Sequence, residues 1–361
     1  GAVSVSDQAV MCDETVMEKS GHTRTAVQQV MLGTILGNAG QAKETLRFIL
    51  EAGYDGIELN GFMIRRMPPS VRLLTKFAGM PVGKSGSLDW LPIIRESGLE
   101  VPSIHEDLGT IENNFSSVVK EAKDFCTDTV VITGMYRFDY SSMEELTSLC
   151  NRLNESGKKL AGEGIALLYH NHNAEFRKVQ GYEQFLTGRV GRETQRVKSG
   201  HSMYAVNPDH KMHSVNPGRK MKFGKVEYTS SDCPAFPWEE KTAFDFLLEQ
   251  TDPRYVNFEF DSYWAAEAGA DPLFIMKKLG NRKKLYHIND RGTRLAGKSM
   301  TPILKSDSME LGYGNMNLIS LLNQAKNNGA RAVILESHKN WAEKSPVRSL
   351  QISAEFLKEF I

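Results

Sequence analysis

Short apolar runs alternate along most of the chain with longer segments in which apolar residues recur at helical spacing. Runs of five to eight residues bounded by polar or turn residues suit buried parallel strands. We therefore predict eight strands, at 27–33, 54–59, 99–105, 128–133, 165–172, 255–261, 284–288 and 331–336. Helical periodicity predicts helices at 42–52, 88–97, 114–126, 141–162, 242–250, 265–279, 318–328 and 347–361.

Eight strand–helix units in succession predict an α/β fold, and they favour a closed (β/α)8 TIM barrel rather than an open sheet. No G-x-G-x-x-G pattern follows the first strand, which argues against a dinucleotide-binding fold. Residues 1–26 are polar and lack periodicity, so we expect a tail or strap outside a barrel that spans 27–361. Residues 177–240 break the rhythm directly after the fifth strand. A connection of this length is a functional insertion or disorder, and we expect a lid over the barrel mouth.

The fifth strand leads into an unusual polar segment, IALLYHNHNAEF at 165–176. Side chains alternate along a strand, so His170 and His172 share one face and point inward if Leu168 does. Glu175 follows three residues later. In barrels of parallel strands, catalytic groups collect at the C-terminal strand ends. The alternative is two ordinary histidines in a strand-to-loop turn.

Ionisable residues end most of the other predicted strands as well. Carboxylates and imidazoles together suit Mn²⁺, Zn²⁺, Co²⁺ or Mg²⁺ better than a metal that prefers thiolates. Taken singly, Asp261 has a structural alternative as the N-cap of the next helix, and Glu336 as a surface carboxylate. Their joint placement on strands five to eight predicts a metal site. The residues at or just beyond these strand ends are Glu58, His105, His170, His172, Glu175, Glu259, Asp261, His287, Asp290 and Glu336.

Composition narrows the function further. Lys and Arg total 44 and Asp and Glu total 44, so a neutral chain has no global electrostatic reason to bind nucleic acid. The four cysteines are scattered and predict neither a disulfide framework nor a zinc knuckle. The sequence has no run of eighteen apolar residues, so we expect no transmembrane helix. The first residue is Gly, not Met, so we interpret the start as trimmed and expect a soluble protein, with export slightly favoured over the cytoplasm.

Four segments resemble the sugar phosphate isomerase/epimerase family, whose fold is the xylose isomerase-like TIM barrel of the AP endonuclease 2 superfamily. They are FEFDSYWAAEAGADP, YHIND, ELGYGNMNL and AVILESH. The resemblance implies one divalent metal ion, held by Asp261, His287, Glu336 and a residue of the fifth strand. Epimerases of the family have a glutamate there, and this chain has His170 at the matching place. We expect Glu175 to reach back to the metal, with His170 or His172 as the alternative ligand.

The resemblance also implies an activity on a sugar or sugar derivative. The metal would stabilise an enediolate, and Glu336 with His170 or His172 would transfer protons as acid and base. His105, Trp264, Asp290 and Glu58 would contact the substrate. A dehydratase or lyase acting on a keto-sugar, keto-inositol or 3-keto-glycoside is the alternative enzyme. The expected partner is a small carbohydrate, without nucleic acid or membrane, and the chain is a possible homo-oligomer. A non-catalytic sugar-binding barrel would predict a broken ligand set.

Overall fold

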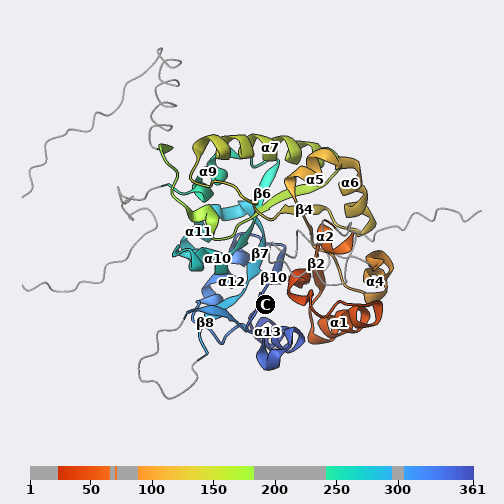
Figure 1. The fold of residues 1–361 in the computed structure, drawn as a ribbon. Coiled ribbons are helices and arrows are strands. Elements are labelled where there is room, and N and C mark those ends of the chain that lie inside the picture. Colours follow the sequence, from red (N-terminus) through yellow and green to blue (C-terminus); the bar gives the residue numbers. More distant parts are fainter. Residues whose placement is uncertain (1–22, 66–69, 71–87, 183–240, 295–304) are drawn as a thin grey trace, which may run out of the picture.

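The computed structural model describes residues 23–65, 70, 88–182, 241–294 and 305–361. Eight parallel strands close into a barrel in the order β1-β10-β7-β6-β5-β4-β3-β2 (Figure 1). This confirms the (β/α)8 prediction. The strands are β1 (Arg24–Gln28), β2 (Gly56–Asn60), β3 (Ile104–Glu106), β4 (Thr129–Ile132), β5 (Ala166–His170), β6 (Val256–Asp261), β7 (Lys283–Ile288) and β10 (Ala332–Leu335).

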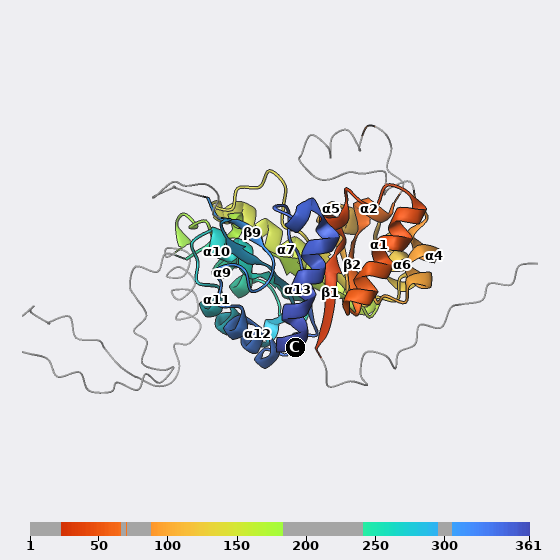
Figure 2. The ribbon, with the colours of Figure 1, turned by 90° about the horizontal axis from the view of Figure 1, so that it is seen from below.

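Helices form a ring outside the barrel, and the last one, α13, packs against the first, α1 (Figures 1 and 2). Several begin at the side-chain caps that their sequences indicate: Ser142 accepts from the Glu145 amide, and Thr242 and Asp245 form a capping box. The α-helices are α1 (Ala39–Ala52), α2 (Gly61–Ile64), α4 (Trp90–Ser97), α5 (Leu108–Asn113), α6 (Phe115–Asp124), α7 (Met143–Gly162), α9 (Ala243–Gln250), α10 (Ser262–Glu267), α11 (Pro272–Leu279), α12 (Leu318–Asn327) and α13 (Pro346–Phe360). The 3-10 helices are η1 (Gln29–Leu32), η3 (Ala174–Phe176), η4 (Gly280–Arg282) and η5 (Ala342–Lys344).

The predicted first strand at 27–33 is wrong in its bounds. β1 begins at Arg24, which pairs with Ala332, so residues 24–26 belong to the barrel and not to the expected tail. The strand stops at Gln28 because its side chain accepts a hydrogen bond from the Val30 amide at 2.6 Å and caps η1. The rest of the expected tail, 1–22, lies outside the described residues.

Two other segments differ from the prediction. The helix expected at 265–279 is two helices, α10 and α11, separated where Gly269 adopts a φ of 82° and Asp271 caps α11. The segment between β7 and α12, for which neither strand nor helix is predicted, includes a two-stranded antiparallel sheet, β8 (Asp290–Gly292) with β9 (Asp307–Met309).

Most of the insertion expected to form a lid, 183–240, lies outside the described residues. Its two ends are described and lie side by side. Lys178 bridges Thr242 in antiparallel fashion, and the Val179 amide donates to the Lys241 carbonyl at 3.0 Å.

The hydrophobic core has two parts. The larger lies between the barrel and its helices, and a small cluster fills the barrel interior. The interior cluster contains Ala26, Val131, Leu168, Leu285, Ala332 and Ile334, and we call it the apolar floor. Because inward positions recur every second residue, the next inward positions above the floor form a polar layer. No helix of the described residues is both long and apolar enough to cross a membrane.

Candidate metal centre

Strand alternation places the polar layer two residues beyond the apolar floor. His170 follows Leu168 on β5, His287 follows Leu285 on β7, and Glu336 follows Ile334 just after β10. Parallel pairing aligns these strands, with Asp261 of β6 opposite His287. The C-terminal strand ends therefore bring carboxylates and imidazoles from different strands to one place, as a TIM barrel does with its catalytic residues.

Four of these side chains converge on one point, and we call them the outer group: His170, Asp261, His287 and Glu336. His287 Nδ1 lies 2.8 Å from Glu336 Oε2 and 3.7 Å from Asp261 Oδ2. His170 Nε2 lies 3.3 Å from Asp261 Oδ2 and 3.7 Å from Glu336 Oε2. All four side chains are buried. Separations of this size are those of neighbouring ligands around a divalent ion bound at about 2.0–2.2 Å.

Asp261 uses its two oxygens for different purposes. Oδ1 accepts from the Trp264 amide at 3.0 Å and caps α10, while Oδ2 faces the outer group. The structural alternative and the metal role predicted from the sequence therefore both fit the same residue. Asn171 fixes the backbone of Asp261: its side-chain oxygen accepts from the Asp261 amide at 2.9 Å, and its amide nitrogen donates to the Asp261 carbonyl at 3.1 Å.

A second cluster lies deeper in the barrel. Its own members are Glu58, His105 and Glu259, which we call the inner group, and His287 touches it from above. His287 Nε2 lies 2.6 Å from Glu58 Oε1 and 2.7 Å from Glu259 Oε1. His105 Nε2 lies 2.9 Å from each of the same two oxygens. Glu58 and His105 therefore lie inside the barrel, behind the outer group.

These clusters shift the pKa values of their members strongly. Burial disfavours charge on His105, but Glu58 and Glu259 outweigh it and raise its pKa to about 10. Burial likewise opposes charge on His287, yet Glu259, Glu58 and Glu336 raise its pKa well above the ordinary value. Burial would raise the pKa of Glu336, but His287 outweighs it and lowers that pKa well below the usual range. The carboxylates thus favour a positive charge on both imidazoles, and His287 favours a negative charge on Glu336.

Glu175 does not join the outer group, contrary to our expectation that it supplies the fifth-strand ligand. Its Oε1 accepts from the Tyr169 hydroxyl at 2.8 Å, and its Oε2 accepts from the His172 amide at 2.9 Å. Tyr169 belongs to the core outside the barrel, so η3 turns the Glu175 carboxylate away from the interior. His170 occupies the fifth-strand place among the converging donors.

The mouth above the outer group has an aromatic wall. The His172 ring lies edge-on to His170 at 5.0 Å and to Trp264 at 5.8 Å between centroids. The Trp264 ring lies 5.1 Å from that of His338, an exposed residue. Burial lowers the pKa of His172 to about 3, and the neighbouring His170 adds to this, so His172 is neutral. His338 follows Glu336 by two residues, and the pattern of strand ends did not predict it as a site residue.

Asp290 has a structural role that its position after β7 did not reveal. Its Oδ1 accepts from the amides of Arg291 and Met316, at 2.8 and 3.2 Å. Its Oδ2 accepts from the amides of Gly312 and Gly314, at 3.1 and 2.8 Å. Both oxygens of this carboxylate, expected to bind substrate, thus hold the loop before α12.

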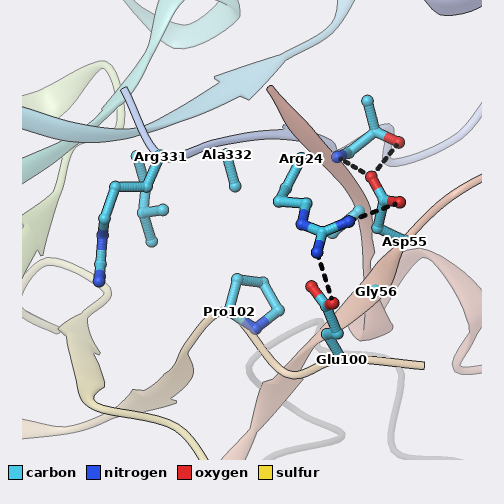
Figure 3. A pocket seen from close by; sticks show the side chains of 10 residues that line it. Arg24, Asp55, Gly56, Glu100, Pro102, Arg331 and Ala332 are labelled. Atoms are coloured by element: carbon cyan, nitrogen blue, oxygen red, sulfur yellow. Dashed lines mark hydrogen bonds and ion pairs between the residues drawn. The ribbon is translucent and has the colours of Figure 1, made fainter. Parts of the chain in front are cut away.

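A small pocket opens at the other end of the barrel, beneath the apolar floor (Figure 3). Arg24 lies there between Asp55 and Glu100, at 3.4 and 3.1 Å, and Arg331 pairs with Asp128 at 3.2 Å. This is the N-terminal end of the strands, where barrels place stabilising contacts and not catalytic ones. The converging imidazoles and carboxylates lie at the opposite end.

Solved structures share this architecture. A sugar phosphate isomerase/epimerase from Parabacteroides distasonis has a TM-score of 0.62 and 18% identity, covering 94% of this chain and 95% of its own. The fold is that of the xylose isomerase-like barrels. A probable 3-DHS dehydratase from Bacillus anthracis has a TM-score of 0.53 and 13% identity, covering 93% of this chain and 98% of its own. The IOLI protein with a bound zinc atom has the same TM-score and identity, covering 93% of this chain and 97% of its own. No family model matches the sequence, and no curated protein matches it.

Proposed function

We propose that this protein is a divalent-metal-dependent enzyme that transfers a proton at a carbon next to a carbonyl group of a sugar or sugar derivative, as an isomerase or epimerase. The observation that carries the proposal is the outer group. His170, Asp261 and Glu336, with His287, present two imidazole nitrogens and two carboxylate oxygens to one point at the mouth end of the barrel. The similar folds include a sugar phosphate isomerase/epimerase, which supports the same class of substrate.

The outer group fits a resident divalent ion in both chemistry and support. Two imidazoles beside two carboxylates favour Zn²⁺, Mn²⁺ or Co²⁺ over Mg²⁺, which prefers oxygen ligands. His287 turns Nδ1 toward the outer group while its Nε2 contacts Glu58 at 2.6 Å, the arrangement of a metal-binding histidine held by a carboxylate. Asp261 is held by Asn171. When bound, such an ion acts as a Lewis acid that polarises the substrate carbonyl and acidifies the neighbouring C–H bond.

The chain supplies two groups on different sides of this point for proton transfer. Glu336 stands just after β10, where His287 outweighs the effect of burial and holds its pKa well below the usual range. His172 stands beyond the end of β5 against Trp264, and an imidazole can act as an acid or a base. Glu175 is unavailable for this step because Tyr169 and the His172 amide hold its carboxylate. We therefore assign the proton transfers to Glu336 and His172, and the fifth-strand ligand to His170.

The direct test is proton exchange. The metal-loaded protein is incubated in D₂O with a panel of ketoses, aldoses and keto-glycosides, and deuterium at carbon is followed by NMR. We expect exchange into at least one substrate, its loss in Glu336→Gln, and a loss of about two to four orders of magnitude in His172→Gln with the metal retained. A full rate in Glu336→Gln would refute the assignment.

Elimination is the second candidate, and the fifth strand favours it. The ring centroids of His170 and His172 lie 5.0 Å apart at the end of that strand, so an imidazole stands where it can protonate a leaving hydroxyl or alkoxide. One of the similar folds is a probable dehydratase. The same incubations distinguish the two reactions by mass, because an isomerase changes the substrate mass only by the deuterium taken up, whereas a lyase releases water or an alcohol.

We also propose export to an oxidising compartment. Cys126 is disulfide-bonded, and disulfides persist in secreted and periplasmic proteins and are rare in the cytosol. Cys150 is a buried free thiol. Fractionation of the native host, with mass spectrometry of Cys126 peptides without reduction, tests this proposal. A reduced Cys126 in protein isolated under thiol-blocking conditions would contradict it.

A further inference from the structure

We propose that the inner group of Glu58, His105 and Glu259 forms a second divalent-cation site inside the barrel, beneath the outer group. The inference goes beyond the proposed function, which needs only the outer ion. It begins from the contacts of His105. Its Nε2 lies 2.9 Å from both Glu58 Oε1 and Glu259 Oε1. One N–H bond points in one direction, and only the contact with Glu259 has hydrogen-bond geometry.

The same three atoms have the spacing of a coordination site. Neighbouring nitrogen and oxygen ligands of an ion bound at about 2.0–2.2 Å lie roughly 3 Å apart. The members come from three strands, β2, β3 and β6, and the barrel closes around them. Glu58 and Glu259 are fully buried, and His105 is 4% exposed.

The neighbours of the inner group orient it as outer-shell partners orient metal ligands. His105 Nδ1 lies 2.6 Å from Thr133 Oγ1, and a ring whose Nδ1–H donates to a hydroxyl presents the lone pair of Nε2. The Ser103 hydroxyl donates to Glu58 Oε2 at 2.5 Å. Glu259 Oε2 is buried and has no hydrogen-bond partner among the described residues, which leaves it as a further donor atom for a cation.

Counting charges leads to the same conclusion. The outer ion takes the lone pair of His287 Nδ1, so His287 can no longer carry a positive charge. Asp261 and Glu336 balance that ion. Glu58 and Glu259 are then left with His105 as their only cation among the described groups in contact with them. A buried net negative charge is unfavourable. A second divalent ion, with neutral His105 as a ligand, balances both carboxylates.

His287 links the two sites without bridging the ions. Its Nε2–H donates to Glu58 at 2.6 Å, so it serves as a ligand of the outer ion and as an outer-shell donor to the inner one. Occupation of one site therefore orients a ligand of the other.

The experiment counts ions. Full-length protein is dialysed to equilibrium with Mn²⁺, desalted, and measured by inductively coupled plasma mass spectrometry against protein concentration. We expect about two ions per chain in the wild type, about one in His105→Gln, about one in Asp261→Asn, and none in the double variant. His338→Gln should keep two. Circular dichroism checks the fold of each variant, and Glu58→Gln replaces His105→Gln if the latter unfolds.

Two results would overturn the inner site: a wild type that saturates at one ion and loses it in Asp261→Asn, or a folded His105→Gln that binds as many ions as the wild type. Anomalous diffraction from Mn²⁺-loaded wild-type crystals gives an answer without any variant. We expect two peaks, one of them in contact with Glu58, His105 and Glu259, and the lack of a peak in contact with these residues refutes the inference. Failure of the proposed function would look different, because Asp261→Asn would then lose no ion.

Discussion

Replacing Asp261 with asparagine should remove the outer ion while leaving the local fold intact. The two carboxylate oxygens act separately: Oδ1 caps α10 through the Trp264 amide at 3.0 Å, and Oδ2 lies 3.3 Å from His170 Nε2. Asparagine keeps an oxygen for the cap, since Asn and Asp are about equally good N-caps. It removes one of the two negative charges that balance the ion. Changing an outer-shell partner weakens metal affinity about 10–100-fold, so loss of a direct ligand should exceed the upper figure.

Asp261→Ala separates the two roles. It removes the ligand and the cap together, so the ion-free alanine variant should have a free energy of unfolding lower than that of the asparagine variant by about 1 kcal/mol. Urea unfolding of both ion-free proteins measures this difference, and equilibrium dialysis with Mn²⁺ measures affinity. Wild-type affinity in Asp261→Asn would refute the ligand assignment. Equal destabilisation in both variants would show that the carboxylate charge, and not the cap, supports the fold.

Three further outcomes follow from groups around the site. Glu175→Gln should keep the ion content of the wild type, because its carboxylate is held by Tyr169 and the His172 amide; loss of the ion would restore Glu175 as the fifth-strand ligand. Ion binding at pH 7 should release protons and become tighter as pH rises, because the pKa of His287 is raised well above its ordinary value and the ion must displace the proton on its ring. Calorimetry in buffers of different ionisation enthalpy would detect the released protons. Binding without proton release would contradict the assignment of His287 as a ligand. Burial lowers the pKa of Lys283 to about 7, and its Nζ has no hydrogen-bond partner among the described residues. The pKa of a lysine in the unfolded chain is about 10.4, so this amine should lower the free energy of unfolding by roughly 3–5 kcal/mol below pH 7, and the effect should decrease toward pH 10. In urea titrations, Lys283→Met should therefore raise the free energy of unfolding at pH 6 and much less at pH 10. An equal gain at both pH values would refute the argument.

The barrel could be predicted from the sequence because buried parallel strands appear as short apolar runs, and eight of them alternate with amphipathic helices. Strand ends then located Asp261, His287 and Glu336 by simple counting. The end of β1 was predicted wrongly because the Gln28 side chain, by capping the next turn, ends the strand where the apolar run continues through Leu32. A side-chain hydrogen bond of this kind has no periodicity in the sequence.

The fifth strand shows where such reasoning fails. Alternation predicts a shared face for His170 and His172, but β5 ends at His170, so His172 follows the loop and not the pleat. Glu175 was the nearest carboxylate along the chain, yet η3 turns it toward Tyr169. The convergence of Glu58, His105 and Glu259 depends on closure of the barrel, which brings together residues as far apart as 58 and 259. The separation of these residues along the sequence does not indicate that they are in contact.

The paired ends of the insertion have an evolutionary consequence. The chain on the two sides of the insertion meets at Val179 and Lys241, whose carbonyl accepts from the Val179 amide at 3.0 Å. The barrel therefore joins the segment between them through one closed stem. Descendants can lengthen, shorten or exchange the segment between these residues while the strands and the outer group stay as they are. Selection can thus act on this excursion and on the metal chemistry as two nearly independent traits.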